Sequence, residues 1–379
     1  MGEVQGGEKD QATGRTLRDQ KRQQLRNVRL LLILPFAVTA ILVAPLGILK
    51  KASEVEVSLK VSQLSFVIGE QGNGLFNGLP TASLSLLSFQ KVDLGPAVLE
   101  IATAIDPNSD TPTNWRQIGR RTESRIISRD HFASVTFQDV SLNQLSIPPG
   151  SVTTLSWLDS ESNFLKLRVD GGEATGRIAA GRKLRLSCNA CEVSGLPPGY
   201  DLNSKFLRFT AHRRHVMTFR GRREGTTLAV ELPPGMKLVE QNVYIKGDVD
   251  FTQLEGARRI STVIGEEGKI TFKELGNEEV KVSAGDFVIL NDLQDFFLKT
   301  LHVEDGINIV LHGRAGKLAT GPQGFVKDRL PSLLEFLYAG QIWGRWALYL
   351  NAVVLIGTTI LAILKRLRIL REEEQGNLA

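Results

Sequence analysis

The chain has 379 residues, 42% of them hydrophobic, and a formal net charge of +5 at pH 7. Residues 1–29 carry seven basic and four acidic side chains, and residues 346–379 carry four and three, so only +1 remains for everything between. A main domain this close to neutrality argues against nucleic acid as a partner, because nucleic-acid-binding domains gather excess positive charge.

The first predicted element is a membrane span at residues 30–49, preceded by a basic cytoplasmic tail at 1–29. The span contains no charged residue and is bounded by Arg29 and Lys50. Its helical length, at about 1.5 Å per residue, reaches the roughly 30 Å thickness of the hydrocarbon core. The apolar run exceeds that of a signal peptide and no small-residue cleavage site follows, so we expect an uncleaved anchor.

A second predicted span occupies residues 343–364 and is followed by a cytoplasmic tail at 365–379. Trp343, Trp346 and Tyr349 cluster at its start, as expected for aromatic side chains at the lipid–water boundary. Lys and Arg are concentrated before the first span and after the second, rather than on the flanks that face the main domain. The positive-inside rule therefore places both termini in the cytoplasm. The exposed region contains no Asn-x-Ser/Thr sequence, which favours a bacterial inner membrane with a periplasmic or extracellular main domain.

Residues 50–342 have mainly strand character. Apolar residues alternate with polar ones from Val55 to Val61, and the alternation resumes in the opposite phase from Leu64 to Ile68, which indicates a bulge or turn between them. Similar runs occur at 133–138, 164–169, 205–210, 226–232, 237–249, 268–273 and 306–312. Many short strands predict a mainly β domain of the sandwich or jelly-roll type, with a candidate subdivision near 155–160.

Two segments of this region predict helix. Residues 292–301 place Leu293, Phe296, Phe297 and Leu301 at helical spacing. Residues 331–338 begin with a proline suited to a first helical turn and continue with several apolar residues.

The two cysteines, Cys188 and Cys191, form a Cys-x-x-Cys sequence with three interpretations. A redox pair needs a βαβ setting, whereas the surrounding pattern is strand. A zinc site needs further ligands, and no second such pair exists. We therefore favour a local disulfide, or two unreactive thiols, in an oxidising compartment.

An arginine-rich segment is the most suggestive feature for binding. Guanidinium groups bind phosphate and carboxylate in bidentate fashion, so this segment is a candidate site for an anionic lipid headgroup or an acidic glycan. The alternative is that these arginines pair with the acidic side chains concentrated between 266 and 295. The residues concerned are Arg208, Arg213, Arg214, Arg220, Arg222 and Arg223.

Signatures of catalysis are weak. No Gly-x-Ser-x-Gly elbow or Walker loop is present, and His212 and His215 fall on opposite faces if their segment is a strand. We therefore predict no enzyme activity, no cofactor and no metal.

The leading functional hypothesis is a membrane-anchored adaptor or assembly subunit of an envelope complex, with membrane lipids and a membrane protein or a second copy as partners. Two alternatives remain: a lipid or glycan carrier that uses a groove and the arginines, and a redox protein that uses the cysteine pair. Two terminal spans around a large external domain resemble the topology of polysaccharide co-polymerases. The external domains of that family are largely helical, so no residue roles are carried over.

Overall fold

The computed structural model describes residues 44–70, 77–105, 112–117, 122–158, 164–194, 205–211, 215–232, 236–239, 242–339, 357 and 365. The predicted spans at 30–49 and 343–364 lie outside these residues, apart from 44–49 and 357, and so do the tails, apart from 365. Within the described residues, no helix has the length and apolar character needed to cross a bilayer.

The chain divides into two units, and one of them contains the segments that flank the predicted spans. Residues 44–48 are helical, and an antiparallel bridge joins Lys50 to Ser332. Helix α2 (Leu333–Ala339) follows, which confirms the helix predicted near 331–338. Ser332 and Glu335 cap it reciprocally, since the Ser332 N–H donates to Glu335 Oε2 at 2.7 Å and the Glu335 N–H donates to Ser332 Oγ at 3.2 Å.

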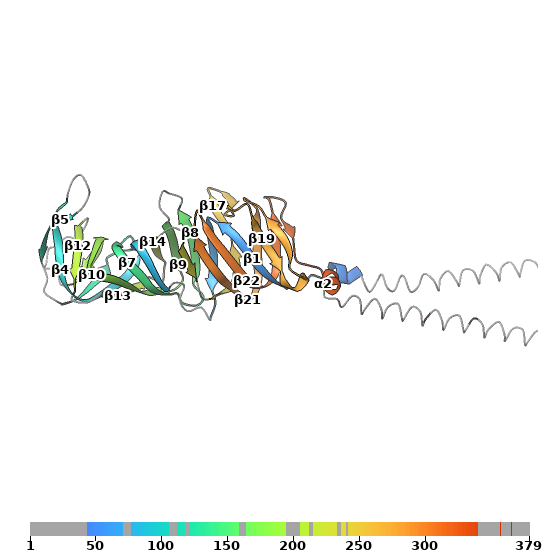
Figure 1. Cartoon of the computed structure of the whole chain (residues 1–379), viewed down its shortest axis with the longest axis horizontal. Coiled ribbons are helices and arrows are strands. Elements are labelled where there is room, and N and C mark those ends of the chain that lie inside the picture. The colour runs from blue at the N-terminus through green and yellow to red at the C-terminus, as the bar shows by residue number, and fades with distance from the viewer. Residues whose placement is uncertain are drawn as a thin grey trace, which may run out of the picture. The chain divides into compact units, whose positions relative to one another are not determined.

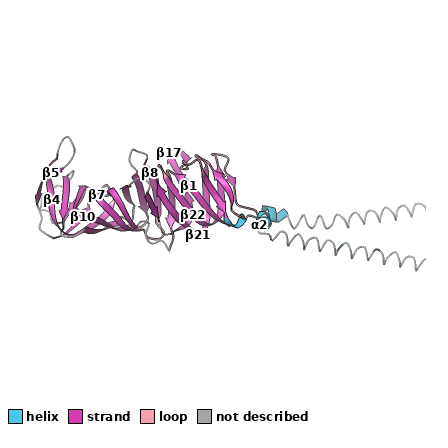
Figure 2. Ribbon diagram, in the orientation of Figure 1, coloured by secondary structure: helices cyan, strands magenta, loops and turns pink. Residues whose placement is uncertain are grey.

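The other unit, Ala52–Lys273 with Asn277–Leu330, is built of strands (Figure 2). Its described strands form one 21-stranded sheet with antiparallel pairing throughout, plus a separate two-stranded hairpin. The mainly β class predicted from the sequence is therefore confirmed.

One end of this sheet, which we call the β1 end, contains the strands nearest the chain termini (Figure 1). In order across the sheet they are β20 (Glu278–Val282), β19 (Gly268–Phe272), β1 (Ser53–Val61), β22 (Ile307–Gly321), β21 (Phe287–Val303) and β16 (Val243–Asp250). Short additions are β15 (Met236–Val239), β23 (Lys327–Asp328), the hairpin β17 (Thr252–Glu255) and β18 (Arg258–Ser261), and the 3₁₀ turn η1 (Lys273–Leu275).

The sheet continues from β16 through a middle section to the opposite end, which we call the β10 end (Figure 1). The middle strands are β2 (Gln63–Ile68), β8 (Val152–Leu158), β9 (Phe164–Asp170), β14 (Thr226–Glu231), β3 (Asn77–Leu87) and β7 (Ser134–Ser146). The β10 end comprises β10 (Thr175–Asn189), β12 (Lys205–Thr210), β13 (His215–Gly221), β4 (Phe89–Ile105), β5 (Pro112–Gln117), β6 (Thr122–Ser128) and β11 (Cys191–Val193).

The candidate subdivision near 155–160 falls at the end of β8 and in the following residues, 159–163, which lie outside the described ones. Strands β8 and β9 on either side pair with each other and belong to the same unit. A domain boundary there stays a prediction.

Apolar alternation builds the core of this unit. Along β1, Val55, Val57, Leu59 and Val61 point inward and are almost wholly buried, while the intervening residues are partly exposed. The phase change predicted after Val61 occurs at Ser62, where the chain leaves β1, which pairs with β19 and β22, and enters β2, which pairs with β8 and β16. Because of this change of phase, the apolar side chains of β1 and those of β2 both lie on the buried side of the sheet.

The helix predicted at 292–301 is wrong, because these residues belong to the long strand β21. Asp292 and Asp295 have positive φ values of 54° and 48°, and the pairing with β22 shifts between Gln294 and Phe297. Bulges of this kind insert extra residues into a strand, so the buried Phe296 and Leu301 lose the strict period of two. The interrupted strand period imitates a helical one in the sequence.

Candidate anion-binding face

Strand β10 is the centre of the β10 end, because it pairs with β7 along one side and with β12 and β13 along the other. This pairing brings the arginine-rich segment beside a strand that is inconspicuous in the sequence. Arg185 lies directly opposite Arg208, and Arg177 lies diagonally across from Arg220. Directly opposed Cβ atoms in such sheets are about 4.5–5.5 Å apart, so these cationic side chains share one outer surface.

The outer side of β10 carries basic side chains and its inner side carries apolar ones. Ala179 and Ala180 are both buried, and the register with β7 slips between Ala180 and Arg185. The resulting kink exposes two consecutive basic residues in addition to the regularly alternating ones. The exposed cations of β10 are Arg177, Arg182, Lys183 and Arg185.

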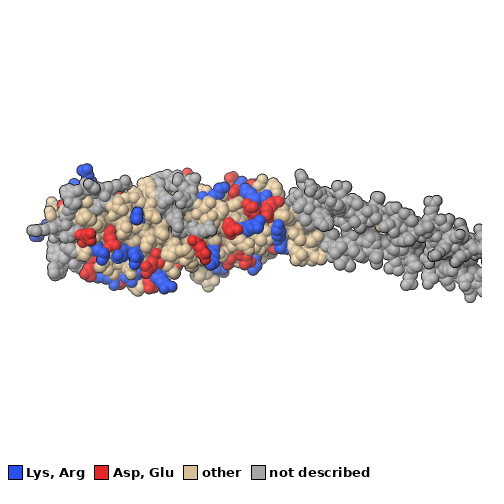
Figure 3. Space-filling model, turned by 90° about the horizontal axis from the view of Figure 1, so that it is seen from below, with Lys and Arg blue, Asp and Glu red and all other residues tan. Residues whose placement is uncertain are grey.

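The β10 cations form no ion pair with a described residue, a property that they share with exposed lysines elsewhere in the unit such as Lys281 and Lys327. They differ from those lysines because they follow one another along a single strand. Ion pairs between described residues engage Arg208 and Arg220 on the neighbouring strands, but none engages a basic side chain of β10. On one face of the molecule, basic and acidic side chains form patches separated by uncharged surface (Figure 3).

A glycine fixes the packing of β10 against β13. Gly176 lies directly opposite Phe219, and a Cβ atom at position 176 would overlap the Phe219 ring. The buried ring therefore packs over the bare backbone of β10 on the inner side of the sheet, opposite the face that carries Thr175 and Arg177. Only glycine permits this close approach.

Arg208 lies in a constrained environment beside β4 and β5. Its side chain is only 17% exposed, and its Nη1 lies 3.6 Å from Glu100 Oε2 on β4. Its guanidinium carbon lies 3.9 Å from the centroid of the Trp115 ring on β5, a cation–π contact. The buried Arg208 Nε has no hydrogen-bond partner among the described residues.

Arg220 and Arg223 are both exposed. Arg220 Nε lies 4.0 Å from Glu173 Oε2, and the Arg223 carbonyl accepts a hydrogen bond from the Gly171 N–H at 3.0 Å. Arg213 and Arg214 lie outside the described residues. The structure therefore places Arg208 and Arg220 on the surface shared with β10.

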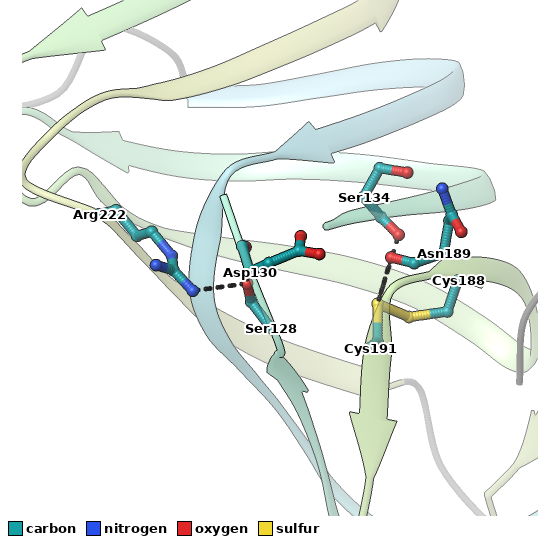
Figure 4. Close-up of a disulfide and its surroundings, with 7 residues drawn as sticks. All are labelled: Ser128, Asp130, Ser134, Cys188, Asn189, Cys191 and Arg222. Atoms are coloured by element: carbon teal, nitrogen blue, oxygen red, sulfur yellow. Dashed lines mark hydrogen bonds between the residues drawn. A yellow bond between two sulfur atoms is a disulfide. The ribbon is translucent and has the colours of Figure 1, made fainter. Parts of the chain in front are cut away.

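Arg222 belongs instead to a structural network (Figure 4). Its Nε donates to the Phe89 carbonyl at 3.0 Å, and its Nη2 donates to Ser128 Oγ at 2.8 Å. Its Nη1 lies 3.5 Å from His131 Nδ1. With its donors used to join β4, β6 and the turn after β6, Arg222 has little capacity left for a ligand.

The arginines do not pair with the acidic side chains of the last third, within the part of the chain that the structure describes. Two of those acidic residues have lysine partners instead: Glu279 lies 3.1 Å from Lys269, and Asp292 lies 3.6 Å from Lys317. The sequence gives no sign of this pairing, because it depends on which strands lie next to each other.

A carboxylate interrupts the basic surface at β4. Burial raises the pKa of Asp93, but hydrogen bonds from Arg125 and Lys91 outweigh it and hold that pKa below its usual value. Lys91 Nζ lies 3.1 Å from Asp93 Oδ2. In this triad one carboxylate holds two cations, which leaves a net charge of +1 at the border of the β10 surface.

Lys91 also stands three residues after Ser88, the spacing of a Ser-x-x-Lys catalytic pair. That pair acts from one turn of a helix, whereas Lys91 lies on strand β4 and is held by Asp93. The spacing therefore does not indicate a catalytic base here.

Cys188 and Cys191 are joined by a disulfide at the turn between β10 and β11 (Figure 4). Both are 3% exposed, and Cys191 Sγ lies 3.4 Å from the Ser134 carbonyl oxygen. Catalytic pairs of this type have a thiol that is accessible and lies at the start of a helix. The burial and the strand setting indicate a structural crosslink.

Other sites of chemistry are limited. The described residues contain no group of His, Cys, Asp and Glu side chains suited to a metal ion. A pocket of about 380 Å³ opens between β1, β19, β21 and β22, and its lining includes Lys60, Glu266, Glu267, His302 and Asn308. Both signs of charge line it, so it is unsuited to an apolar chain.

Sequence reasoning identified Arg208 and Arg220 but missed the exposed cations of β10. These cations are spread over a strand, so they produce no local charge cluster, and only the alternation of basic and apolar residues at 184–186 marks the outward side. No protein family, curated protein or solved structure matches this chain.

Proposed function

We propose that this protein is a non-enzymatic adaptor or assembly subunit of a bacterial envelope complex. Helices at 30–49 and 343–364 anchor it in the inner membrane, both termini are cytoplasmic, and the β-rich unit lies on the periplasmic or extracellular side. Its partners are membrane lipids and a membrane protein or a second copy of the chain. A sandwich- or jelly-roll-like closure of the sheet between the two anchors is part of this proposal.

The observation that carries the proposal is the burial of the inward apolar side chains of the β-rich unit. Its buried apolar side chains, from β1 through the middle section to β4 and β10, are each no more than 5% exposed. A carrier needs an apolar chamber that its ligand can enter, and such chambers leave their lining accessible. Because these apolar side chains are inaccessible, we take the outer surface as the place where this unit meets other molecules, which favours an adaptor over a carrier.

The unit that flanks the predicted spans supports double anchoring. The Leu333 N–H donates to the Leu49 carbonyl at 2.8 Å, and Lys51 Nζ lies 3.7 Å from the centroid of the Phe336 ring. Together with the bridge between Lys50 and Ser332, these contacts fasten the segments that lead into the two spans. Because the segment after the first span and the segment before the second contact each other, the two spans are suited to packing side by side in one bilayer.

The test is the mass of the full-length protein after extraction in a mild detergent. Native mass spectrometry and light scattering are expected to find it in a defined complex, with a second membrane protein or a further copy in fixed ratio. A homogeneous monomer, without partner, in several mild detergents contradicts the adaptor. A stoichiometric bound lipid in that monomer would instead support the carrier.

The topology needs a separate measurement. Protease added to intact spheroplasts is expected to cleave the β-rich unit, whereas tags on either terminus stay protected. Protection of the β-rich unit contradicts the proposed location.

A further inference from the structure

We propose that the outer face of β10, with the adjoining residues of β7, β12 and β13, binds a linear anionic glycopolymer. The ligand carries carboxylate or phosphate groups at intervals along a hydroxyl-rich chain. This inference goes beyond the adaptor role because it assigns a ligand to a surface of the β-rich unit.

The first argument is unbalanced charge. The four β10 cations are exposed and form no ion pair with a described residue. Arg220 adds a partly engaged guanidinium from the neighbouring strand, at 4.0 Å from Glu173. Three acidic side chains face this surface. Glu173 lies 4.0 Å from Arg220 and Glu100 lies 3.6 Å from Arg208, whereas the exposed Asp139 at the slip of β7 has no ion-pair partner among the described residues. Cations remain in excess after all three are counted.

The second argument is the linear arrangement. Arg177 and Arg185 are eight residues apart on one strand, so at about 3.3 Å per residue they are separated by roughly 25 Å or less. Arg182 and Lys183 fill the interval at the kink. A row of this length matches several successive charges of an extended polymer better than it matches one headgroup. Each arginine fork can hold a carboxylate or a phosphate through two hydrogen bonds.

The third argument concerns the kind of polymer. Protein interfaces usually need buried aromatic or aliphatic anchors, and the row on β10 contains none. The nearest exposed apolar side chain is Val216 on β13, at 58% exposure. On the opposite side of the row, β7 supplies the uncharged polar residues Gln138, Ser141 and Gln144 as register partners. Amide and hydroxyl groups beside the cations suit the hydroxyls of a glycan.

The position of β10 within the sheet excludes one way of binding protein. Both of its sides are paired, with β7 and with β12 or β13, except at the kink around residues 181–184, so no continuous edge remains for an added strand. A ligand on this face must bind through side chains.

The experiment uses the full-length protein in phosphatidylcholine nanodiscs, so that the lipid adds no net charge. Binding by interferometry is measured for polygalacturonate, which carries carboxylates, and for poly(glycerol phosphate), which carries phosphates. Neutral dextran and poly-glutamate, an acidic polypeptide, are measured beside them. The test variant is Arg177→Gln/Lys183→Gln/Arg185→Gln. We expect it to bind the preferred polyanion at least roughly tenfold more weakly at low salt, because three exposed charge contacts are lost.

The matched control removes the same charge elsewhere in the β-rich unit. Lys166, Lys281 and Lys327 are exposed on β9, β20 and β23, and none forms an ion pair with a described residue. The Lys166→Gln/Lys281→Gln/Lys327→Gln variant is expected to change affinity less than about twofold. Unchanged circular dichroism and urea midpoints for both variants show that neither acts through unfolding.

Each outcome decides the proposal. Selective weakening of the β10 variant with either polyanion supports it, and the preferred polymer tells carboxylate from phosphate. Equal weakening of both variants overturns it, since net charge alone would then explain binding. No binding, or tighter binding of poly-glutamate, also overturns it, the latter in favour of an acidic protein. The binding result does not depend on topology, so it can stand if the spheroplast experiment contradicts the proposed location.

Discussion

The two ends of the sheet treat charge differently although the same alternation of apolar and polar residues builds both. At the β1 end, Glu56 lies 3.5 Å from both Lys273 and Lys299, and other acids there have lysine partners of their own. At the β10 end, the cations of the central strand have no ion-pair partners among the described residues. Exposed lysines without an ion-pair partner among the described residues also occur at the β1 end, at Lys281 and Lys327. The β10 end differs because four such cations follow one another along one strand, and this concentration is the feature that favours a ligand. The following variants are ways to test that distinction.

The largest expected effect removes an aromatic side chain from beneath the cationic face. Phe209 is fully buried on β12, on the side opposite Arg208. Phe209→Ala is expected to lower the free energy of unfolding by about 3–5 kcal/mol, because it loses apolar burial and leaves a cavity. Urea denaturation followed by circular dichroism measures the change.

Phe66→Ala, in the middle section, is the matched variant because Phe66 is also fully buried. If the sheet unfolds as one unit, both variants shift the same transition by similar amounts. Two separate transitions, each shifted by one variant only, would show that the β10 end unfolds independently of the middle section and would strengthen its contrast with the rest of the sheet.

The next effect separates structural from ligand-binding arginines. Arg222→Ala removes hydrogen bonds to the Phe89 carbonyl and to Ser128 Oγ. We expect a loss of about 1.5–3 kcal/mol in unfolding free energy, the range for hydrogen bonds to charged groups. Arg223→Ala, one residue further on and exposed, is expected to stay within about 0.5 kcal/mol of the parent. Equal losses would mean that the hydrogen bonds of Arg222, partly shown in Figure 4, do not stabilise the fold.

A similar loss is expected on removal of the disulfide. Cys188→Ser/Cys191→Ser opens a very short loop, for which the chain-entropy relation gives about 2 kcal/mol. Polyanion binding and complex mass are expected to remain unchanged, because the crosslink is buried away from the outer face. Loss of a biological activity in a variant that is still folded would revive the redox hypothesis.

Sequence patterns predicted the β class because alternation is a local property, as Val55 to Val61 and then Leu64 to Ile68 illustrate. They failed at β21, where bulges at Asp292 and Asp295 break the period. The pairing of Arg208 with Glu100 joins residues more than 100 positions apart and has no local signature. The β10 cations were missed for the same reason, because their significance comes from the strands beside them.

The smallest effect concerns the carboxylates that are paired at each end. Burial raises the pKa of Glu56, but Lys273 and Lys299 outweigh it and hold that pKa below the usual 4.5. The unfolded chain therefore binds a proton more readily than the folded one. The stabilisation is present above about pH 4.5 and is lost as pH falls through the lower folded value.

Glu56→Gln is therefore expected to reduce stability by less than about 1 kcal/mol at pH 7, and to flatten its decline between about pH 5 and pH 3. Asp93→Asn, at the other end, is expected to behave alike because the pKa of Asp93 is lowered by Lys91 and Arg125. Urea midpoints measured across this range test both. If the ends differ only in their unpaired cations, the two variants give similar pH profiles of stability. Only Asp93→Asn is then expected to increase polyanion affinity, because it releases two more basic groups beside the β10 face. An equal gain from Glu56→Gln would remove the distinction between the ends.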